Sequence, residues 1–180
     1  MTELKVYIAG KVNPNSVFGT HDWRDSFCEK LSKETGFKIV NLDPTKSNEN
    51  LSLDEGNPNL IFGRDCHMIK SADVIIVVLT DDISVGGSQE MLISKYFSKP
   101  LIGIAQKGGK FVKEEKEILG KVYKNWTHPF VDIPCDALFE DIEGAADFIK
   151  KITSESKVDI KGISVIDEAV NYYKKNHHHL

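Results

Sequence analysis

The sequence lacks the features that mark secreted, membrane-spanning or disulfide-stabilised proteins. Only three of its 180 residues are cysteines. Because Cys28, Cys66 and Cys135 are widely separated and odd in number, we expect reduced thiols rather than a disulfide framework. No apolar run approaches the roughly 20 residues that a transmembrane helix needs, and Met1–Lys5 lead directly into a predicted strand rather than a signal peptide. We therefore expect a cytoplasmic protein that has no membrane partner.

The chain also lacks an excess of positive charge. Its 23 lysine and arginine residues are outnumbered by 27 aspartate and glutamate residues, which gives a formal net charge of −4. Proteins that bind nucleic acid need basic patches to neutralise its phosphates, so we expect no nucleic-acid polymer as a partner. This charge balance does not exclude a mononucleotide, which needs only one local anion site.

Clusters of metal ligands are missing as well. His21, Cys66 and His67 lack the spacing that would let them share a metal ion with a fourth ligand. The histidines at 177–179 form a run at the end of the chain and resemble the remnant of a tag. The sequence therefore predicts no metal site.

Apolar segments suited to strands alternate with helical segments along the chain. The predicted strands are 6–9, 37–42, 74–79, 101–104 and 129–133, and the predicted helices are 23–35, 60–71, 87–98, 113–124, 137–152 and 163–174. This alternation predicts βαβ units in an α/β fold, namely a single three-layer domain with a mostly parallel, doubly wound sheet of about five strands, flavodoxin-like or Rossmann-like. We expect residues 1–155 to form this domain and 156–180 to form a C-terminal helical extension and tail. The polar segment 43–59 is predicted to be a long loop of the kind that serves as a lid or binding segment.

The segment from Asp65 to Pro100 gives the strongest indication of a functional site. The apolar run 74–79 suits a central strand covered on both faces, and the glycines that follow it suit a tight turn into a helix. Open α/β sheets bind ligands at the carboxyl edge where such turns lie. Glu90 falls on the first turn of that helix, where the helix dipole favours the ionised carboxylate that a nucleophile needs. The simpler alternative is that Glu90 only complements the dipole.

Several spacings in this segment are similar to those of the nucleoside 2-deoxyribosyltransferase family and its nucleotide N-glycosidase relatives. Asp65 stands seven residues before Ala72 of the buried strand, and Glu90 stands nine residues before the Lys99–Pro100 pair. The early strand also carries a tyrosine, Tyr7, near its end. The resemblance covers roughly residues 4–152 and is most specific in the middle of the chain.

The resemblance implies cleavage of an N-glycosidic bond through a covalent glutamyl–sugar intermediate, without a metal or organic cofactor. In this reaction Glu90 is the nucleophile, the hydroxyl of Tyr7 holds its carboxylate, and Asp65 contacts the base and helps to protonate it. A free nucleobase as acceptor gives transfer of the deoxyribosyl group, and water gives hydrolysis. The resemblance also implies a homodimer or a larger homo-oligomer. If the resemblance is set aside, the simpler interpretation is that Asp65 lies on a solvated helix face and that Tyr7 is a core residue.

One departure from the family pattern concerns the phosphate. Transferases that act on free nucleosides commonly have an aspartate six residues before the nucleophile, where this chain has Ser84, and the nucleotide-hydrolysing relatives have a serine there that helps to hold a 5′-phosphate. Ser84 is equally suited to capping the helix, and Asp81 or Asp82 is an alternative source of the missing carboxylate. The predicted substrate-binding residues are Gly10, Trp23, Asp82, Ser84, Gly86, Gly87 and Ser88.

Two further points stay open from the sequence. Trp23 and its neighbour Arg24 suit stacking on a base and contact with a phosphate, and they equally suit packing and capping of the first helix.

The predicted function is transfer of a 2′-deoxyribosyl group from a deoxynucleoside to another nucleobase. The alternatives are hydrolysis of nucleoside 5′-monophosphates to base and sugar 5-phosphate, and a non-catalytic nucleotide-binding sensor.

Overall fold

The computed structural model describes residues 2–10, 23–44, 46, 56–80, 83–155 and 158–177. Its strands are β1 (Glu3–Ala9), β2 (Lys38–Asn41), β3 (Val74–Leu79), β4 (Leu101–Ala105), β5 (Val112–Ile118), β6 (Lys121–Thr127) and β7 (Ala137–Phe139). Its helices are α1 (Trp23–Thr35), α3 (Pro58–Ser71), α4 (Val85–Tyr96), α5 (Pro129–Asp132), α6 (Ile142–Ser154) and α7 (Val165–Asn176).

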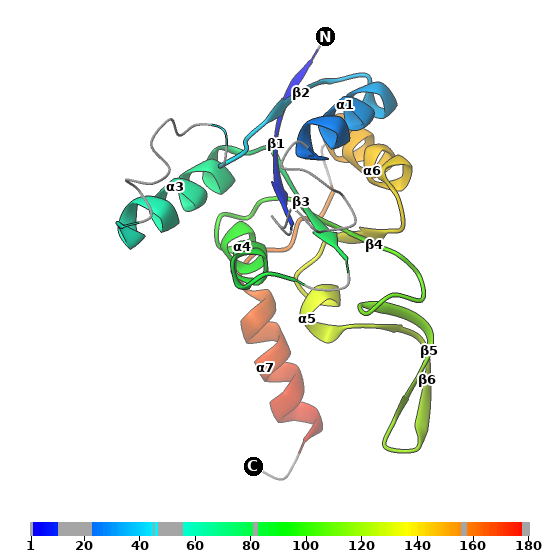
Figure 1. The fold of residues 1–180 in the computed structure, drawn as a ribbon. Coiled ribbons are helices and arrows are strands. Elements are labelled where there is room, and N and C mark those ends of the chain that lie inside the picture. Colours follow the sequence, from blue (N-terminus) through cyan, green and yellow to red (C-terminus); the bar gives the residue numbers. More distant parts are fainter. Residues whose placement is uncertain are drawn as a thin grey trace.

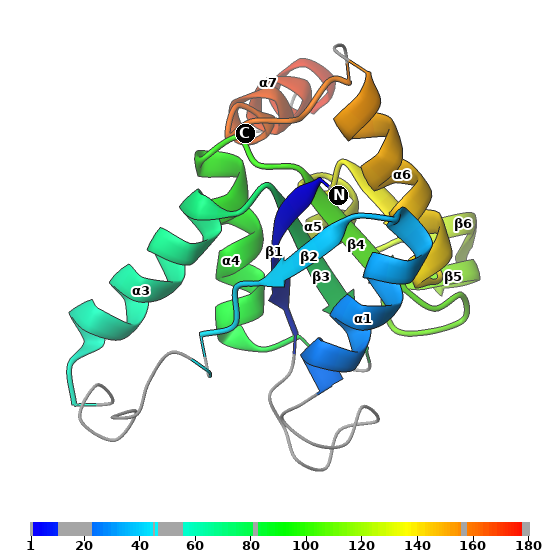
Figure 2. The same cartoon turned by 90° about the horizontal axis from the view of Figure 1, so that it is seen from above.

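Five strands form one parallel sheet in the order β2-β1-β3-β4-β7. Helices α1 and α6 lie together on one side of this sheet, and α3 and α4 lie on the other (Figures 1 and 2). The chain passes from β1 outward to β2 and then crosses β1 to β3, so the direction of winding changes between β1 and β3. The predicted α/β fold with a doubly wound, five-stranded parallel sheet is confirmed.

The two faces of the sheet form two separate cores, because successive residues of a strand point to opposite sides. On the α1 and α6 side, Ile8 and Ile76 lie in one apolar cluster, and on the α3 and α4 side Tyr7 and Ile75 lie in another. All six residues of β3 are buried. This is what the continuous apolar run predicts for a central strand with both faces covered.

Helix ends are set by residues that the sequence makes recognisable. Gly36 follows α1 with a φ of +74°, a conformation that suits glycine at a helix C-terminus. Asn57 caps α3 by accepting from the N–H of Leu60, and Ser84 caps α4 by accepting from the N–H of Gly87. The helices predicted at 23–35 and 60–71 and the strand at 74–79 are therefore confirmed, with small shifts at their ends.

The helix predicted over 113–124 is wrong. This segment belongs to an antiparallel hairpin, β5 and β6, outside the main sheet. Leu119 and Gly120 join the two strands with φ values of +51° and +76°, which no α-helix can include. Figure 1 shows the hairpin projecting from the body of the molecule.

The predicted fifth strand is also misplaced. Residues 129–133 hold the short helix α5 instead, in which Pro129 occupies the first turn, where its missing N–H costs nothing. The fifth strand of the sheet is β7. It occupies the first residues of the segment 137–152, all of which was predicted to be helical. Asp141 follows it and caps α6 by accepting from the N–H of Gly144 at 2.9 Å, so the helix begins only at Ile142.

The segment leading to α7 is attached to the sheet through buried charges. Lys95 is fully buried, and its ammonium donates to Asp136 at 2.5 Å and to the carbonyl oxygen of Lys99 at 2.9 Å. Asp136 also accepts from the backbone N–H groups of Leu101 and Lys161 at 2.6 and 2.8 Å. Residues 158–162 are thereby tied to the start of β4 and of β7.

The sequence led us to expect no membrane-spanning helix and no disulfide framework. None of the helices described for this chain is both long and apolar enough to cross a membrane. The three cysteines are all free, with Cys28 and Cys135 buried and Cys66 partly exposed.

Candidate active site

The carboxyl edge of the sheet brings together Tyr7 and Glu90, which are 83 residues apart in sequence. Tyr7 is 1% exposed near the end of β1, and its hydroxyl donates to Oε1 of Glu90 at 2.9 Å. Glu90 lies in the second turn of α4 and not in the first turn as predicted, because the helix begins at Val85. Strands β1 and β3 are neighbours, and α4 follows β3. The pair therefore lies where the winding of the sheet reverses, which is the ligand-binding position of open α/β folds.

Opposing influences act on the carboxyl group of Glu90. Burial raises its pKa above the ordinary value, and the negative charge of Asp65 adds to this rise. The hydrogen bond from Tyr7 and the positive charge of Arg24 lower it. Burial and the charges of Glu90 and Asp65 raise the pKa of Tyr7 well above its usual range. Tyr7 is therefore a neutral hydrogen-bond donor to Glu90.

Asp65 lies on α3, close enough for its charge to act on both members of this pair. Its carboxylate accepts from Nε of Arg64 at 3.0 Å, and its side chain is 23% exposed. The structure thus brings the three residues expected to be catalytic into one electrostatic neighbourhood. Asp65 has an accessible carboxylate on the same side of the sheet as Tyr7.

The turn between β3 and α4 supplies small residues next to Glu90. The Oγ of Ser84 accepts from the N–H of Gly87 at 3.0 Å, so Ser84 is a helix cap, and the hydroxyl of Ser88 donates to the carbonyl of Val85 at 2.8 Å. A Cβ placed on Gly86 would lie 3.6 Å from Oε1 of Glu90. The backbone of Gly86 therefore comes close to the carboxylate, and the roles of Ser84, Gly87 and Ser88 in binding stay predictions.

The other two predicted binding residues pack against each other. The ring of Trp23 is 8% exposed, and a Cβ on Gly10 would come within 3.0 Å of it. Trp23 also makes an edge contact with Phe27 in the core. The structure thus places Trp23 as a packing residue beneath the end of β1, and its role in binding stays a prediction. Asp81 and Asp82 lie outside the described residues.

The sequence left Arg24 open between contact with a phosphate and capping of the first helix, and the structure gives it a different role. It is 4% exposed, donates through Nε to the carbonyl of Ile8 at 3.1 Å, and donates through Nη2 to the carbonyl of Gly10 at 3.2 Å. Its guanidinium lies over the ring of Trp23, 4.8 Å from the centroid. Arg24 thereby fixes the end of β1 and brings a buried positive charge near Glu90. An arginine after a tryptophan is too weak a pattern to predict this role.

Cys66 also borders the site. The sequence analysis did not predict this, although the position of Cys66 next to Asp65 was a signal for it. Burial, with smaller contributions from the charges of Asp65 and Glu90, raises the pKa of its thiol. The thiol is therefore protonated and is a poor nucleophile. No group of three or more histidine, cysteine, aspartate or glutamate side chains suited to a metal ion occurs in the described part of the chain.

Comparisons with known proteins agree with this fold. No protein-family model and no curated protein matches the chain. A 2-deoxyribosyltransferase from Bacillus psychrosaccharolyticus is 18% identical, with a TM-score of 0.51 over 88% of this chain and 98% of its own. A conserved protein from Enterococcus faecalis V583 is 12% identical, with a TM-score of 0.59 over 84% of this chain and 99% of its own. These two structural matches show that this chain has the fold that the sequence resemblance implied.

A CMP N-glycosidase from Clostridium botulinum, BcmB, also matches, at 11% identity and a TM-score of 0.43 over 82% of this chain and 98% of its own.

Proposed function

We propose that this protein cleaves the N-glycosidic bond of 2′-deoxynucleosides and transfers the deoxyribosyl group to another nucleobase. The observation that carries the proposal is the hydrogen bond from the buried hydroxyl of Tyr7 to the carboxylate of Glu90. A carboxylate held by a neutral donor at the carboxyl edge of the sheet, with a second carboxylate nearby on α3, suits attack on an anomeric carbon.

In the first step, an oxygen of Glu90 forms a bond to the anomeric carbon as the bond from that carbon to the base nitrogen breaks. The electron pair of the broken bond leaves with the base, which takes up a proton. Asp65 is the carboxyl group we assign to this proton transfer, because it is the accessible one beside Glu90. The product is an ester between Glu90 and the sugar.

In the second step, a nitrogen of the incoming base attacks the same carbon from the opposite face of the ester. The bond to Glu90 breaks, the carboxylate regains its electron pair, and Asp65, which gave up a proton in the first step, takes the proton of the acceptor nitrogen. Two successive inversions give retention of configuration. The hydroxyl of Tyr7 keeps Glu90 in one orientation through both steps, while its hydrogen bond and the charge of Arg24 favour the ionised nucleophile.

A specific observation also supports hydrolysis of nucleoside 5′-monophosphates as the second candidate. Because the oxygen of Ser84 accepts from Gly87, the hydrogen of its hydroxyl is available to an acceptor such as a phosphate oxygen. Gly86 lies in the first turn of α4 and has no side chain, so its exposed backbone is accessible beside Glu90. Water would then take the place of the acceptor base.

The proposed substrate is a free nucleoside or nucleotide with a free nucleobase as acceptor, and the proposed setting is the cytoplasm. The three free cysteines suit such a reducing compartment.

The test is a chromatographic assay with deoxynucleosides and their 5′-monophosphates, each with and without an acceptor base. A new nucleoside formed only with acceptor supports transfer, and free base released only from the monophosphates supports hydrolysis and a phosphate contact by Ser84. In either case we expect Glu90→Gln to lower the rate at least about a thousandfold, as loss of a nucleophile does.

The matched control is Glu117→Gln on the exposed hairpin, which makes the same chemical change away from the site and should keep full activity. Saturable nucleotide binding without any base release would replace the enzyme with a binding protein. Activity that survives in Glu90→Gln would overturn the glutamyl mechanism.

A further inference from the structure

Helix α7 projects from the body of the molecule with one apolar face uncovered. Only its first residue, Val165, is buried, whereas Ile166, Val170 and Tyr173 are 46%, 44% and 44% exposed. Their spacing of four and three residues places these side chains on one stripe of the helix. Figure 1 shows α7 extending away from the sheet, below α4.

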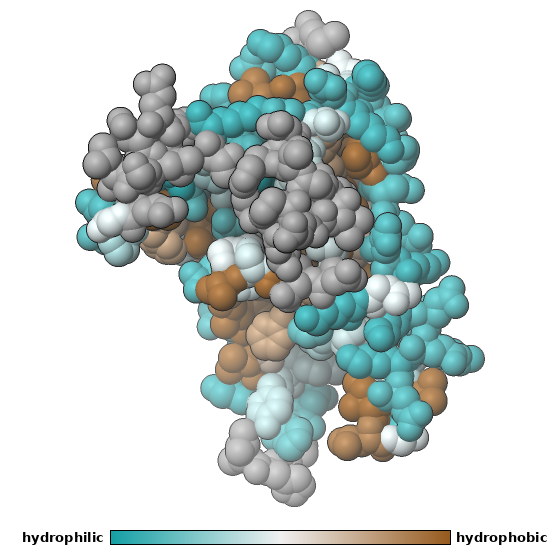
Figure 3. All heavy atoms as spheres, in the orientation of Figure 1, coloured by the Kyte–Doolittle hydropathy of each residue, from teal (hydrophilic) through white to brown (hydrophobic). Residues whose placement is uncertain are grey.

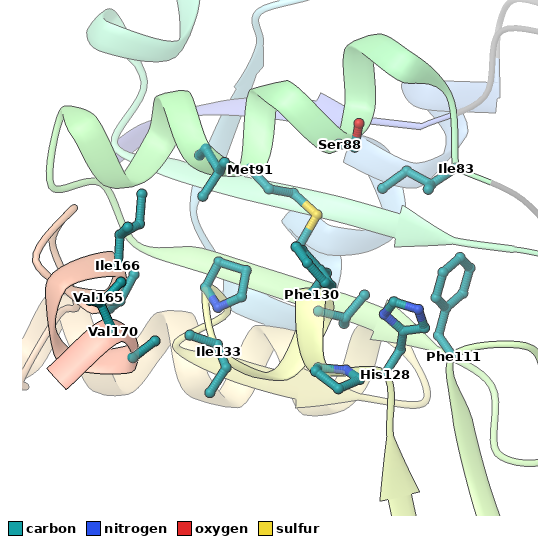
Figure 4. A pocket seen from close by; sticks show the side chains of 15 residues that line it. Ile83, Ser88, Met91, Phe111, His128, Phe130, Ile133, Val165, Ile166 and Val170 are labelled. Atoms are coloured by element: carbon teal, nitrogen blue, oxygen red, sulfur yellow. The ribbon is translucent and has the colours of Figure 1, made fainter. Parts of the chain in front are cut away.

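This stripe forms one wall of an apolar groove of about 490 Å³. Figure 4 shows Val165, Ile166 and Val170 of α7 on one side of the groove, with Met91 of α4 and Ile133, which follows α5, facing them. In the orientation of Figure 1, hydrophobic residues gather where α4 meets α7 (Figure 3). Monomeric proteins rarely leave a continuous apolar surface of this kind uncovered.

The rim of the groove adds further exposed apolar side chains. Leu92 of α4, Phe130 of α5 and Ile133 are 43%, 83% and 46% exposed. Ser88 and His128 are the two polar residues among those described that line the groove. A small-molecule site normally includes several polar groups that fix the orientation of its ligand. The groove therefore suits an apolar helix face better than a small metabolite.

We propose that the occupant of this groove is α7 of a second copy of this chain, with the two α7 helices antiparallel about a twofold axis near Val170. A twofold interface buries the same surface on both partners. Each copy supplies both the groove and the helix that fills it, so the surface is self-complementary. The resemblance of the sequence to a family implied an oligomer without indicating which surface forms it.

The charges beside the stripe fix the antiparallel direction. Asp167 and Lys174 are seven residues apart, so they lie within about 20° of each other around the helix, on one flank of the stripe. In an antiparallel pair centred near Val170, Asp167 of one copy meets Lys174 of the other, and symmetry repeats the contact. A parallel pair would place like charges side by side. Neither side chain has an ion pair among the residues the structure describes.

A stable dimer needs more surface than the α7 stripe alone. Helix α7 has 12 residues and is therefore about 18 Å long. Stable interfaces bury about 800 Å² on each partner, which needs both the α7 stripe and the exposed side chains of α4 and α5 described above. The inference does not depend on the proposed reaction, because Tyr7, Asp65 and Glu90 do not line the groove, and Ser88 is the one described residue of the predicted binding set that does.

The test is the dissociation constant of the full chain, measured by analytical ultracentrifugation. We expect a dimer that Asp167→Lys weakens at least about tenfold and Lys174→Asp weakens similarly, since each change puts like charges in contact. The double variant Asp167→Lys/Lys174→Asp restores opposite charges across the axis and should recover most of the wild-type affinity. Lys175→Asp is the matched control, because it makes the same change in the same turn on the outward face.

Three outcomes would overturn the proposal: a wild-type monomer throughout the micromolar range, a dimer insensitive to Lys174→Asp, or equal weakening by Lys175→Asp. A second measurement does not rely on charge. Val170→Cys near the twofold axis should form a disulfide-linked dimer under mild oxidation, whereas Glu168→Cys on the outward face should not. Circular dichroism of every variant verifies that α7 and the domain remain folded.

Discussion

Glu90 combines burial with two influences that oppose the cost of its charge. Its carboxylate lies where desolvation and Asp65 both favour the protonated form, while the hydroxyl of Tyr7 and the guanidinium of Arg24 favour the anion. A carboxylate that is poorly solvated and still ionised is more reactive than one in water, provided that its geometry is fixed. The 2.9 Å contact with Tyr7 supplies that geometry.

The pH dependence of the reaction follows from the same contact. The hydrogen bond from Tyr7 lowers the pKa of Glu90, so Tyr7→Phe should raise that pKa. Because the proposed nucleophile, Glu90, acts as an anion, the acidic limb of the rate profile should move to higher pH, with the largest loss of activity on the acidic side. A hydrogen bond to a charged group contributes about 1.5–3 kcal/mol, which corresponds to a loss of roughly ten- to a hundredfold.

The measurement is kcat/KM between pH 4 and 9 for the wild type, Tyr7→Phe and Tyr123→Phe. Tyr123 is 40% exposed on the hairpin, so its variant removes the same hydroxyl away from the site. A loss of activity in Tyr7→Phe that is equal at every pH would contradict this account of the hydroxyl.

The sequence predicted those candidate site residues that stand at a distinctive spacing from neighbouring motifs. Tyr7, Asp65 and Glu90 each stand at fixed distances from a buried strand, and the structure places them in one electrostatic neighbourhood. The sequence named Arg24 but not its observed role, which depends on the carbonyl groups of Ile8 and Gly10 that only the folded β1 places within reach. The sequence left Trp23 open between binding and packing, and its buried ring shows that it packs.

At the scale of elements, the hairpin was missed because its local preferences point to a helix. Residues 112–118 carry lysines and glutamates that favour helices, and both strands are largely exposed, so no alternation of apolar residues is visible. Cross-strand pairing decides the outcome: Glu115 faces Lys124, and the ammonium of Lys116 lies 3.4 Å from the ring centroid of Trp126. Such pairs link residues that no local window compares.

The start of α6 depends on a glycine that only the packed structure explains. A Cβ on Gly144 would lie 2.7 Å from the ring of Phe139, whereas a Cβ on Gly63 of α3 would meet nothing within 4 Å. We expect Gly144→Ala to destabilise the protein by about 1–3 kcal/mol through overpacking. Gly63→Ala, its matched control in another helix, should stabilise by about 0.5–1 kcal/mol.

Urea unfolding of the two variants beside the wild type measures both effects. A Gly144→Ala variant at least as stable as the wild type would mean that Phe139 moves aside without cost, contrary to the packing described here.

At the scale of the whole molecule, buried charges join parts of the chain that are distant in sequence. Asp136 accepts from Lys95 at the end of α4, from the start of β4 and from Lys161 ahead of α7. The side chain of Lys161 in turn donates to three carbonyl groups at the end of α5. The last helix is thus anchored to the domain although most of its surface is exposed.

Breaking this ion pair should be far more costly than breaking one at the surface. Lys95→Met leaves Asp136 buried without its ammonium partner, and we expect a loss of about 3–5 kcal/mol. Lys150→Met removes the exposed partner of Asp147 and should cost less than about 1 kcal/mol. Thermal unfolding followed by circular dichroism compares the two, and similar losses would mean that the buried pair contributes no more than the surface pair.

The central position of β1 has a consequence for the newly made chain. Strand β1 is synthesised before β2 and β3 and lies between them in the finished sheet, so both of its edges stay unpaired until residues 38–41 and 74–79 have followed. Unpaired apolar strands invite aggregation, and the charged side chains of Glu3 and Lys5 oppose it at the start of this one. A chain interrupted before Val74 would lack both the pairing partner β3 and the carboxylate that accepts from Tyr7, so the edge of β1 is covered and the Tyr7–Glu90 contact is formed only after the same later segment has been made.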